Sequence, residues 1–248
     1  MSRVAINARH SISPRLLMAL SLVGACDVLA DIGTDHARLP IAAIQRNLIT
    51  HAIACDVAPG PLAAASENIY KAGMLDRIQT RLGNGFDPLR AGEADVAVIA
   101  GMGGMNIVNI LERGAATAKA CRRLVLQPQR DIPALRMQLH RTGYAIINER
   151  LAREGERFYV LLVAEPVDAA MQNAEHSTAG LKMPCVWAPR EYSIGKFLPN
   201  DPLWLDYVRT EITRMQKYIA QGAAGVQLDE YTRRLLWLCE AQDEKCDM

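Results

Sequence analysis

Strand-like stretches, most of them apolar, recur along the first half of the chain and largely alternate with helix-like segments. The strand-like stretches are residues 27–31, 51–56, 78–82, 95–100 and 123–127. The helix-like segments are residues 14–23, 39–47, 59–72, 104–113 and 132–142. Strands that are apolar throughout are buried on both faces, and strand–helix alternation builds a parallel sheet with helices on both sides. The pattern therefore predicts an α/β fold.

The pattern changes after Gly143. Residues 144–151 and 158–164 look like two strands joined by the polar residues 152–157, which predicts a terminal antiparallel hairpin. Residues 202–222 and 228–241 then carry apolar side chains at the spacing of one helical face. We therefore expect one domain over residues 1–165, followed over 166–248 by a linker and an antiparallel helical hairpin.

The first strand ends in Asp31-Ile32-Gly33-Thr34-Asp35-His36, and the second ends at Asp56. A strand, a glycine turn and a helix, followed by a second strand with a terminal acid, is the layout of a nucleotide-cofactor pocket. Gly33 lets a ligand approach the backbone, and Asp56 is placed to accept two ribose hydroxyls. The alternatives are local: Asp35 caps one helix and Asp56 caps the next.

This turn does not carry the G-x-G-x-x-G fingerprint, because Thr34, Asp35 and Ala37 stand where further glycines would be needed. Asp35 also adds negative charge where a diphosphate would bind a helix N-terminus, which argues against a nicotinamide or flavin dinucleotide. S-adenosylmethionine carries no phosphate, and its ammonium group favours a carboxylate. The sequence therefore favours S-adenosylmethionine as the cofactor, held in part by Asp31, Gly33, Asp35 and His36.

Two more glycine-rich loops follow strands at the same edge. Asn84 and Gly85 follow the third strand and suit a loop against adenine, although a plain turn explains them equally well. Three glycines in four positions follow the fourth strand, where a simple turn needs one. From this loop we assign Ala100, Gly101, Met102 and Gly103 to the cofactor site.

Candidates for handling the substrate are Asp35, His36 and Gln127, which the pattern places at the same edge. Each could orient a base or take a proton, and the sequence does not choose among them. A histidine in such a position is more often a partly buried hydrogen-bonding group. The six cysteines form no C-x-x-C pair, so we expect no metal site.

The net charge is only +1, but its distribution is uneven. Residues 1–26 carry three arginines and no acid, and residues 113–157 carry ten basic against four acidic residues. Such asymmetry suits a polyanion, although solvated helix faces explain it equally well. Our candidates for phosphate contacts are Arg3, Arg9, Arg15, Arg122, Arg123 and Arg130. No apolar run reaches the length of a membrane span or forms a signal peptide, so we expect a cytoplasmic protein.

The motifs together resemble the bacterial TrmK family of tRNA (adenine(22)-N1)-methyltransferases. The resemblance covers about residues 10–240 and rests on five passages, the most specific being residues 30–40 and 99–104. The others are residues 11–16, residues 83–85 and residues 192–195, with residues 126–128 beside the glycine-rich loop. Asp56 departs from the glutamate expected at that position, and Met105 departs from the usual small polar residue.

The resemblance implies a class I Rossmann-like methyltransferase domain with a coiled-coil-like helical pair, S-adenosylmethionine as cofactor, tRNA as partner and no metal. Adenine N1 already has a lone pair, so transfer of the methyl group to it needs alignment more than a strong base. Two alternatives remain open: a methyltransferase for a small molecule or protein, and a non-catalytic RNA-binding module. The oligomeric state is not predicted.

Overall fold

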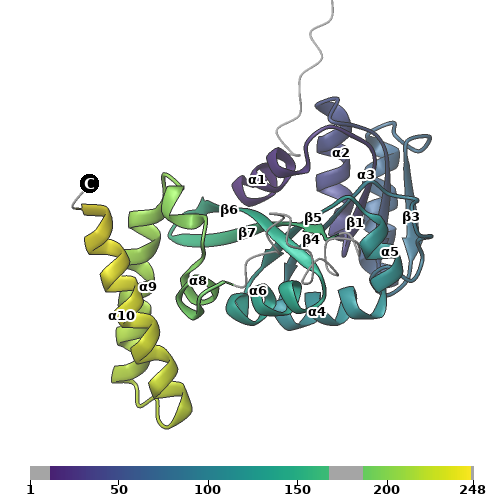
Figure 1. The fold of residues 1–248 in the computed structure, drawn as a ribbon. Coiled ribbons are helices and arrows are strands. Elements are labelled where there is room, and N and C mark those ends of the chain that lie inside the picture. The colour runs from purple at the N-terminus through teal and green to yellow at the C-terminus, as the bar shows by residue number, and fades with distance from the viewer. Residues whose placement is uncertain (1–11, 168–186, 247–248) are drawn as a thin grey trace, which may run out of the picture. The chain divides into compact units, whose positions relative to one another are not determined.

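The structure, a computed structural model, describes residues 12–167 and 187–246. The chain forms two compact units, which are described separately. The first contains residues 1–101 and 109–127, and the second contains residues 102–108 and 128–248. The strand order of the sheet is β3-β2-β1-β4-β5-β7-β6, in which β6 and β7 form the antiparallel hairpin (Figure 1). This is the α/β fold that the sequence predicts, while the predicted domain boundary at residue 165 stays a prediction.

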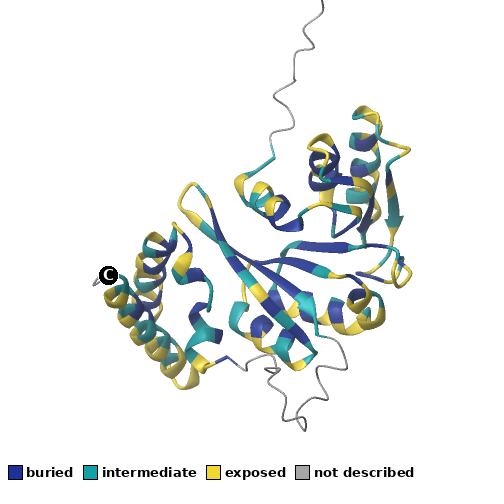
Figure 2. Ribbon diagram, turned by 45° about the horizontal axis from the view of Figure 1, so that its top comes forward, coloured by how far each residue is buried: buried dark blue, intermediate teal, exposed yellow. Residues whose placement is uncertain are grey.

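The first unit contains the strands with the continuous apolar runs, and β1 to β4 pair in parallel. The strands are β1 (Cys26–Ile32), β2 (Ile49–Asp56), β3 (Ile78–Leu82), β4 (Val96–Met102) and β5 (Arg123–Pro128), the last residues of β4 and β5 belonging to the second unit. Val96 to Ile99 are fully buried, as their unbroken hydrophobicity requires. Figure 2 shows the strands largely buried and the outer helix surfaces exposed.

Helices connect these strands where the sequence predicts them. They are α1 (Pro14–Val23), η2 (Asp35–Ala37), α2 (Arg38–Gln45), α3 (Pro59–Lys71), α4 (Gly104–Arg113) and α5 (Ala115–Ala120). Pro14 and Pro59 stand in first turns, where the missing N–H has no intrahelical partner to lose. Gly24 has φ 69° and ends α1. The short α5 was not predicted, because six residues of mostly alanine carry no apolar period.

The second unit contains the hairpin and the C-terminal helices. Its elements are α6 (Ile132–Arg141), β6 (Tyr144–Glu154), β7 (Arg157–Pro166), α8 (Pro189–Ile194), η4 (Leu198–Asn200), α9 (Trp204–Ala220) and α10 (Val226–Cys246). The hairpin is longer than predicted because Arg153 and Glu154 continue the pairing, opposite Phe158 and Arg157. These charged residues give no hydrophobic signal. Only Gly155, with φ 60°, and Glu156 form the turn.

The predicted antiparallel helical hairpin is confirmed, with α9 and α10 packed along their length (Figure 1). Glu211 of α9 is buried and accepts hydrogen bonds from Arg214 Nη2 at 2.6 Å and from Arg234 Nη2 of α10 at 3.0 Å. The two helices are thus joined by a shared carboxylate as well as by their apolar faces. Residues 168–186, where the predicted linker begins, lie outside the described residues, and α8 begins at Pro189.

A buried ion pair fixes the start of this C-terminal region to the hairpin. Arg136 Nε donates to Glu149 Oε1 at 2.7 Å, and both side chains are almost fully buried. Arg136 Nη1 also donates to the carbonyls of Tyr192 and Ser193 at 3.0 and 3.3 Å. Glu149 Oε2 accepts the backbone N–H groups of Lys196 and Phe197. These bonds tie α6, β6 and the segment after α8 into one polar cluster.

Candidate cofactor and substrate site

The turn after β1 is fastened to the end of β2. The backbone N–H groups of Gly33 and Thr34 both donate to the carbonyl oxygen of Cys55 at 2.8 Å. Gly33 has φ 76°, a conformation that glycine adopts without strain. Thr34 is buried, and its hydroxyl donates to Asp31 Oδ2 at 2.7 Å. Sequence reasoning missed this role of Thr34, although a short hydroxyl side chain in an acid–glycine turn is the available signal.

Asp31 is a buried carboxyl group whose protonation is unusual. Burial raises its pKa from 3.8 to about 7, the Thr34 hydrogen bond lowers it, and the charges of Asp56 and Asp35 raise it. Among the described residues, its only side-chain hydrogen bond comes from Thr34. A cation beside Asp31 would stabilise the ionised form. An anionic ligand would instead be repelled by three neighbouring carboxylates, so this edge favours a cationic ligand.

The segment after the turn is strained. Asp35, His36 and Ala37 have φ values of 24°, 65° and 53°, and none of them is glycine. Such conformations cost about 1–3 kcal/mol each and occur mostly at functional sites. The N-cap of α2 is Ala37 and has no side-chain capping bond, so the interpretation of Asp35 as a helix cap is wrong. Its carboxylate instead lies 3.3 Å from His36 Nε2.

Both side chains of this pair face solvent. The side chain of Asp35 is 74% exposed and that of His36 is 43% exposed. The His36 carbonyl accepts a hydrogen bond from Asn68 Nδ2 of α3 at 3.0 Å, which holds the backbone in place. A rigid backbone with an exposed carboxylate and imidazole suits contact with a bound molecule, as the sequence predicts for these two residues.

Asp56 ends β2, and its two carboxylate oxygens differ in their contacts. Its Oδ1 accepts the backbone N–H of Ala58, the N-cap residue of α3, at 2.8 Å, so the capping alternative is correct for one oxygen. For Oδ2 no hydrogen bond is found among the described residues. The Asp56 carbonyl accepts the N–H of Gly83 at 2.9 Å, which links this strand end to the loop after β3.

That loop requires its glycines for space. A Cβ on Gly83 would lie 2.8 Å from Pro88 Cδ, and one on Gly85 would lie 2.8 Å from Ile110 Cγ2. Gly85 also has φ 58°. Asn84 between them is exposed, at the end of β3. The arrangement agrees with the predicted contact to adenine but is also that of a tight turn.

The end of β4 is joined to β5 and α1. Gln127 is buried, 1% exposed, and its Oε1 accepts the N–H of Gly101 and Arg15 Nη1, both at 3.1 Å. Ala100 and Gly101 are half-buried, and Gly101 has φ 81°. The sequence predicts Gln127 at this edge but gives no sign that its amide would be enclosed.

In the second unit, the rest of the glycine loop packs against the segment after β5. Met102 O accepts the N–H of Gln129 at 2.8 Å, and Gly104 N donates to Arg130 O at 2.9 Å. A Cβ on Gly104 would lie 2.6 Å from Asp131 O, and one on Gly103 would lie 2.8 Å from Arg130 Nε. Gly104 is therefore explained by the close approach of backbone, and Gly103 by the close approach of the Arg130 side chain. The Arg130 side chain itself is 74% exposed.

The other arginines are placed differently. Arg123 begins β5 and Arg122 directly precedes it, at the amino edge of the parallel strands, whereas Asp31 and Asp56 stand at the carboxyl edge. Arg122 Nη2 donates to Ala25 O at 2.7 Å. The structure therefore does not bring these two arginines to the acidic site. Arg3 and Arg9 lie outside the described residues.

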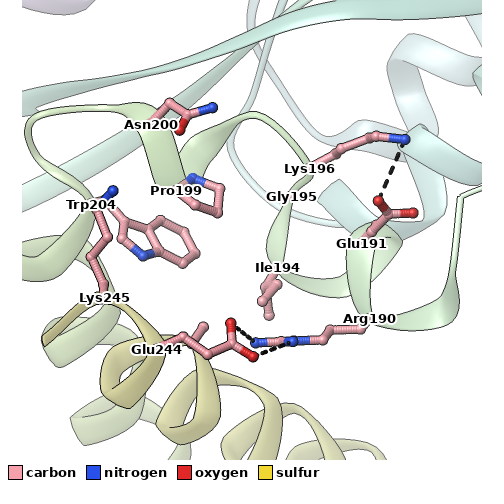
Figure 3. Close-up of a pocket in the computed structure, with 11 residues that line it drawn as sticks. Arg190, Glu191, Ile194, Gly195, Lys196, Pro199, Asn200, Trp204, Glu244 and Lys245 are labelled. Atoms are coloured by element: carbon pink, nitrogen blue, oxygen red, sulfur yellow. Dashed lines mark hydrogen bonds and ion pairs between the residues drawn. The ribbon is translucent and has the colours of Figure 1, made fainter. Parts of the chain in front are cut away.

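A separate cavity of about 240 Å³ lies in the second unit between α8, η4, α9 and α10 (Figure 3). Arg190 points toward Glu244, which it binds with two hydrogen bonds of 2.9 and 2.8 Å, and Lys196 lies 3.4 Å from Glu191. These two cations are thus compensated by acidic side chains, and Lys245 is a third cation in the lining.

Two kinds of structure are absent from the described residues. No helix among them is long and apolar enough to cross a membrane. Within the same residues, no group of three or more histidine, cysteine or acidic side chains is arranged to hold a metal ion. Burial raises the pKa of the Cys121 thiol to about 11 and that of Cys55 to about 12, which keeps both protonated near neutral pH.

Comparison with known proteins identifies the class to which this fold and site belong. Residues 12–162 match the family described as "Methyltransferase domain". The match covers more than half of the chain, so the chain belongs to that family.

Solved structures narrow the relationship further. The crystal structure of the Bacillus subtilis M1A22 tRNA methyltransferase TrmK is 30% identical, covers 94% of this chain and 100% of its own, and has a TM-score of 0.76. Within the methyltransferases, the chain belongs to the TrmK family. Streptococcus pneumoniae Sp1610, solved in complex with S-adenosyl-L-methionine, is 28% identical over 94% of this chain and 100% of its own, with a TM-score of 0.79.

Among curated sequences, the tRNA (adenine(22)-N(1))-methyltransferase of Bacillus subtilis strain 168 is 38% identical over 157 residues. That match covers 63% of this chain and 66% of the relative. The chain spans 60 to 66% of the length of the curated relatives it matches.

Proposed function

We propose that this protein transfers a methyl group from S-adenosylmethionine to N1 of the adenine at position 22 of tRNA. The observation that carries the proposal is the acidic carboxyl edge of the first unit, where Asp31 and Asp56 end neighbouring strands beside the Gly33 turn. The similarity to TrmK of Bacillus subtilis over its whole length supports the tRNA substrate and the position of the modified base. A tRNA substrate implies work in the cytoplasm.

The residues present fit S-adenosylmethionine. When bound, this cofactor supplies an electrophilic methyl group on a sulfonium, together with an ammonium group and a ribose. A buried carboxyl with a pKa near 7 favours a cationic partner, and the ammonium is such a group. Gly33 leaves its backbone open to a ligand, and the unpaired oxygen of Asp56 suits the ribose hydroxyls.

Each of the remaining residues has a defined task in this proposal. Asn84 bonds the edge of the cofactor's adenine. Asp35 and His36, exposed on a rigid and strained backbone, orient the target base or accept a proton from its exocyclic amine. Because N1 attacks with its own lone pair, their contribution is alignment rather than strong base catalysis. N1 lies on the Watson–Crick edge, so the adenine must first be unpaired.

The test is methyl transfer from labelled S-adenosylmethionine to unmodified tRNA and to the same tRNA with guanine at position 22. Products are digested and identified by mass spectrometry. The wild-type protein is expected to make N1-methyladenosine only in the first tRNA. The Asp56→Ala variant is expected to lose at least about tenfold in activity, through weaker binding of the cofactor.

The matched control is Asp76→Ala, which removes an exposed aspartate outside the carboxyl edge. Equal activity of wild type on both tRNAs would reject position 22. Cofactor binding without transfer to any tRNA would assign the site to a small molecule or protein substrate instead.

A further inference from the structure

The amide of Gln127 joins three elements of the first unit. Its Oε1 accepts one hydrogen bond from Gly101 N, at the end of β4, and another from Arg15 Nη1, in the first turn of α1. Gln127 is 1% exposed, and this oxygen already has two donors. A buried oxygen that accepts two hydrogen bonds from the protein is not available to a substrate base.

The bond to Gly101 provides an acceptor at the end of β4, where the backbone leaves the extended conformation. Gly101 has φ 81°, outside the strand conformation, so its N–H needs an acceptor other than the sheet ladder. In this half-buried position an N–H without a partner is unfavourable. Gln127 provides the acceptor, and thereby fixes the residue that opens the glycine-rich loop.

Arg15 stands where a cation is unfavourable for the helix itself. It lies in the first turn of α1, and that turn contains no acidic residue. The partial positive charge of a helix N-terminus repels a guanidinium. Meanwhile Ala19, Leu20 and Val23 are buried and fix how the helix is rotated. Arg15 is thus held in place facing Gln127, and its hydrogen bond fixes the orientation of the amide oxygen that also accepts the Gly101 N–H.

We propose that Arg15 and Gln127 are positioning residues for methyl transfer, which act through Gly101 on the glycine-rich loop, rather than a tRNA phosphate contact and a base contact. This inference rests on the proposed function for its activity readout. Misplacement of a reacting group by about 1 Å can cost a hundredfold in rate. Loss of the link therefore lowers the rate of transfer and leaves tRNA affinity in place.

The decisive variant is Arg15→Lys, because lysine also binds phosphate but lacks the fixed geometry of a guanidinium. Gln127→Leu removes the acceptor, and Gln127→Glu keeps an oxygen for both donors. Three quantities are measured for each variant: the single-turnover rate at saturating tRNA, tRNA affinity over a range of salt, and the midpoint of thermal unfolding. Arg46→Lys, at an exposed arginine that bonds Ala42 O, is the matched control.

We expect Arg15→Lys and Gln127→Leu each to lower the single-turnover rate about tenfold or more, with tRNA affinity and its salt dependence within twofold of wild type. The double variant should be no slower than the slower single variant, because both changes break one link. Gln127→Glu should retain more activity than Gln127→Leu. An unchanged rate in Arg15→Lys overturns the proposal. So does an Arg15→Ala variant with normal rate and a salt slope reduced by about one.

Hydrogen exchange separates this proposal from the proposed function. The Gly101 amide should exchange faster in Gln127→Leu and Arg15→Lys than in wild type and Arg46→Lys, whatever the substrate is. If wild type fails to methylate tRNA, the proposed function is rejected, and exchange alone decides the positioning link. Unchanged exchange at Gly101 in both variants overturns it.

Discussion

At the scale of single residues, the protonation of Asp31 decides how the site responds to pH. Its pKa is about 7 in the folded protein and near 3.8 when the side chain is free, because burial disfavours the charge. Between these values the folded state holds a proton that the unfolded state has released. The contribution of this group to stability therefore falls as pH rises from about 4 to about 7.

The first prediction is that Asp31→Asn removes this part of the pH dependence. The asparagine oxygen still accepts the Thr34 hydroxyl, so the variant should fold. Its free energy of unfolding, measured by denaturant titration from pH 5 to 8, should fall less with rising pH than that of wild type. Parallel curves would show that Asp31 does not titrate in this range.

The same substitution should weaken binding of S-adenosylhomocysteine about tenfold at pH 8, since the ligand's ammonium loses its charged partner. For wild type, calorimetry should find binding that weakens as pH falls below 7, where Asp31 takes up a proton. Binding by Asp31→Asn should lack that change. Equal affinities at pH 8 would place the ammonium elsewhere.

Prediction from sequence succeeded at this scale in placing Asp31 and Asp56 near the ends of their strands, while their part in cofactor binding stays a prediction. It failed where the backbone conformation determines the start of a helix. Asp35 follows a glycine before a helix and was interpreted as a possible cap, but positive φ values at Asp35, His36 and Ala37 place the helix start beyond it. Local propensity disfavours such a run, so nothing in the residue types indicates it.

At the scale of elements, burial pattern and turn chemistry predicted the strands well. The four consecutive buried residues of β4 and the Ser-Pro start of α1 are strong local signals. The short helices α5 and α8 were missed, because neither is long enough to show a period. What holds α8 in place is a long-range contact, the bond from Arg136 to the carbonyl of Tyr192, and sequence spacing does not reveal such a contact.

The next prediction concerns Glu149, the buried ion-pair partner of Arg136. Glu149→Gln leaves the Arg136 guanidinium buried without a charged partner, and removal of one member of a buried ion pair costs about 3–5 kcal/mol. We expect a loss of this size in the free energy of unfolding at pH 7, measured with urea. Glu156→Gln, in the exposed turn of the hairpin, should change stability by less than about 0.5 kcal/mol.

A loss below about 1 kcal/mol in Glu149→Gln would mean that the amide replaces the carboxylate in the cluster, since it can still accept one hydrogen bond. The Arg136→Met and Glu149→Met double variant distinguishes these cases. If the charge pair matters only through its desolvation, the double variant should be more stable than either single change.

At the scale of the whole molecule, the question is which basic residues meet the tRNA. The sequence grouped arginines by charge density, which ignores where each strand begins and ends. Arg123 begins β5 and Arg122 precedes it, so both lie at the amino edge, while Asp31 and Asp56 lie near the ends of β1 and β2, at the carboxyl edge. Strand direction alone would have separated them, because all the strands of a parallel sheet begin at one edge.

Arg130 differs from Arg122 in the property that matters for phosphate binding. Its side chain is 74% exposed, and Arg130 belongs to the segment that packs on Gly103 and Gly104 of the glycine-rich loop. A phosphate contact releases counterions, so its removal lowers the slope of log affinity against log salt by about 0.7–0.9. We therefore expect Arg130→Ala to reduce this slope by about 0.7–0.9, the value for one phosphate contact. Arg122→Ala, which loses a bond to Ala25 O, should leave the slope unchanged and lower thermal stability instead. Filter binding of unmodified tRNA between about 50 and 200 mM salt measures the slope for each variant. Equal slopes in the two variants would mean that the tRNA does not distinguish these arginines.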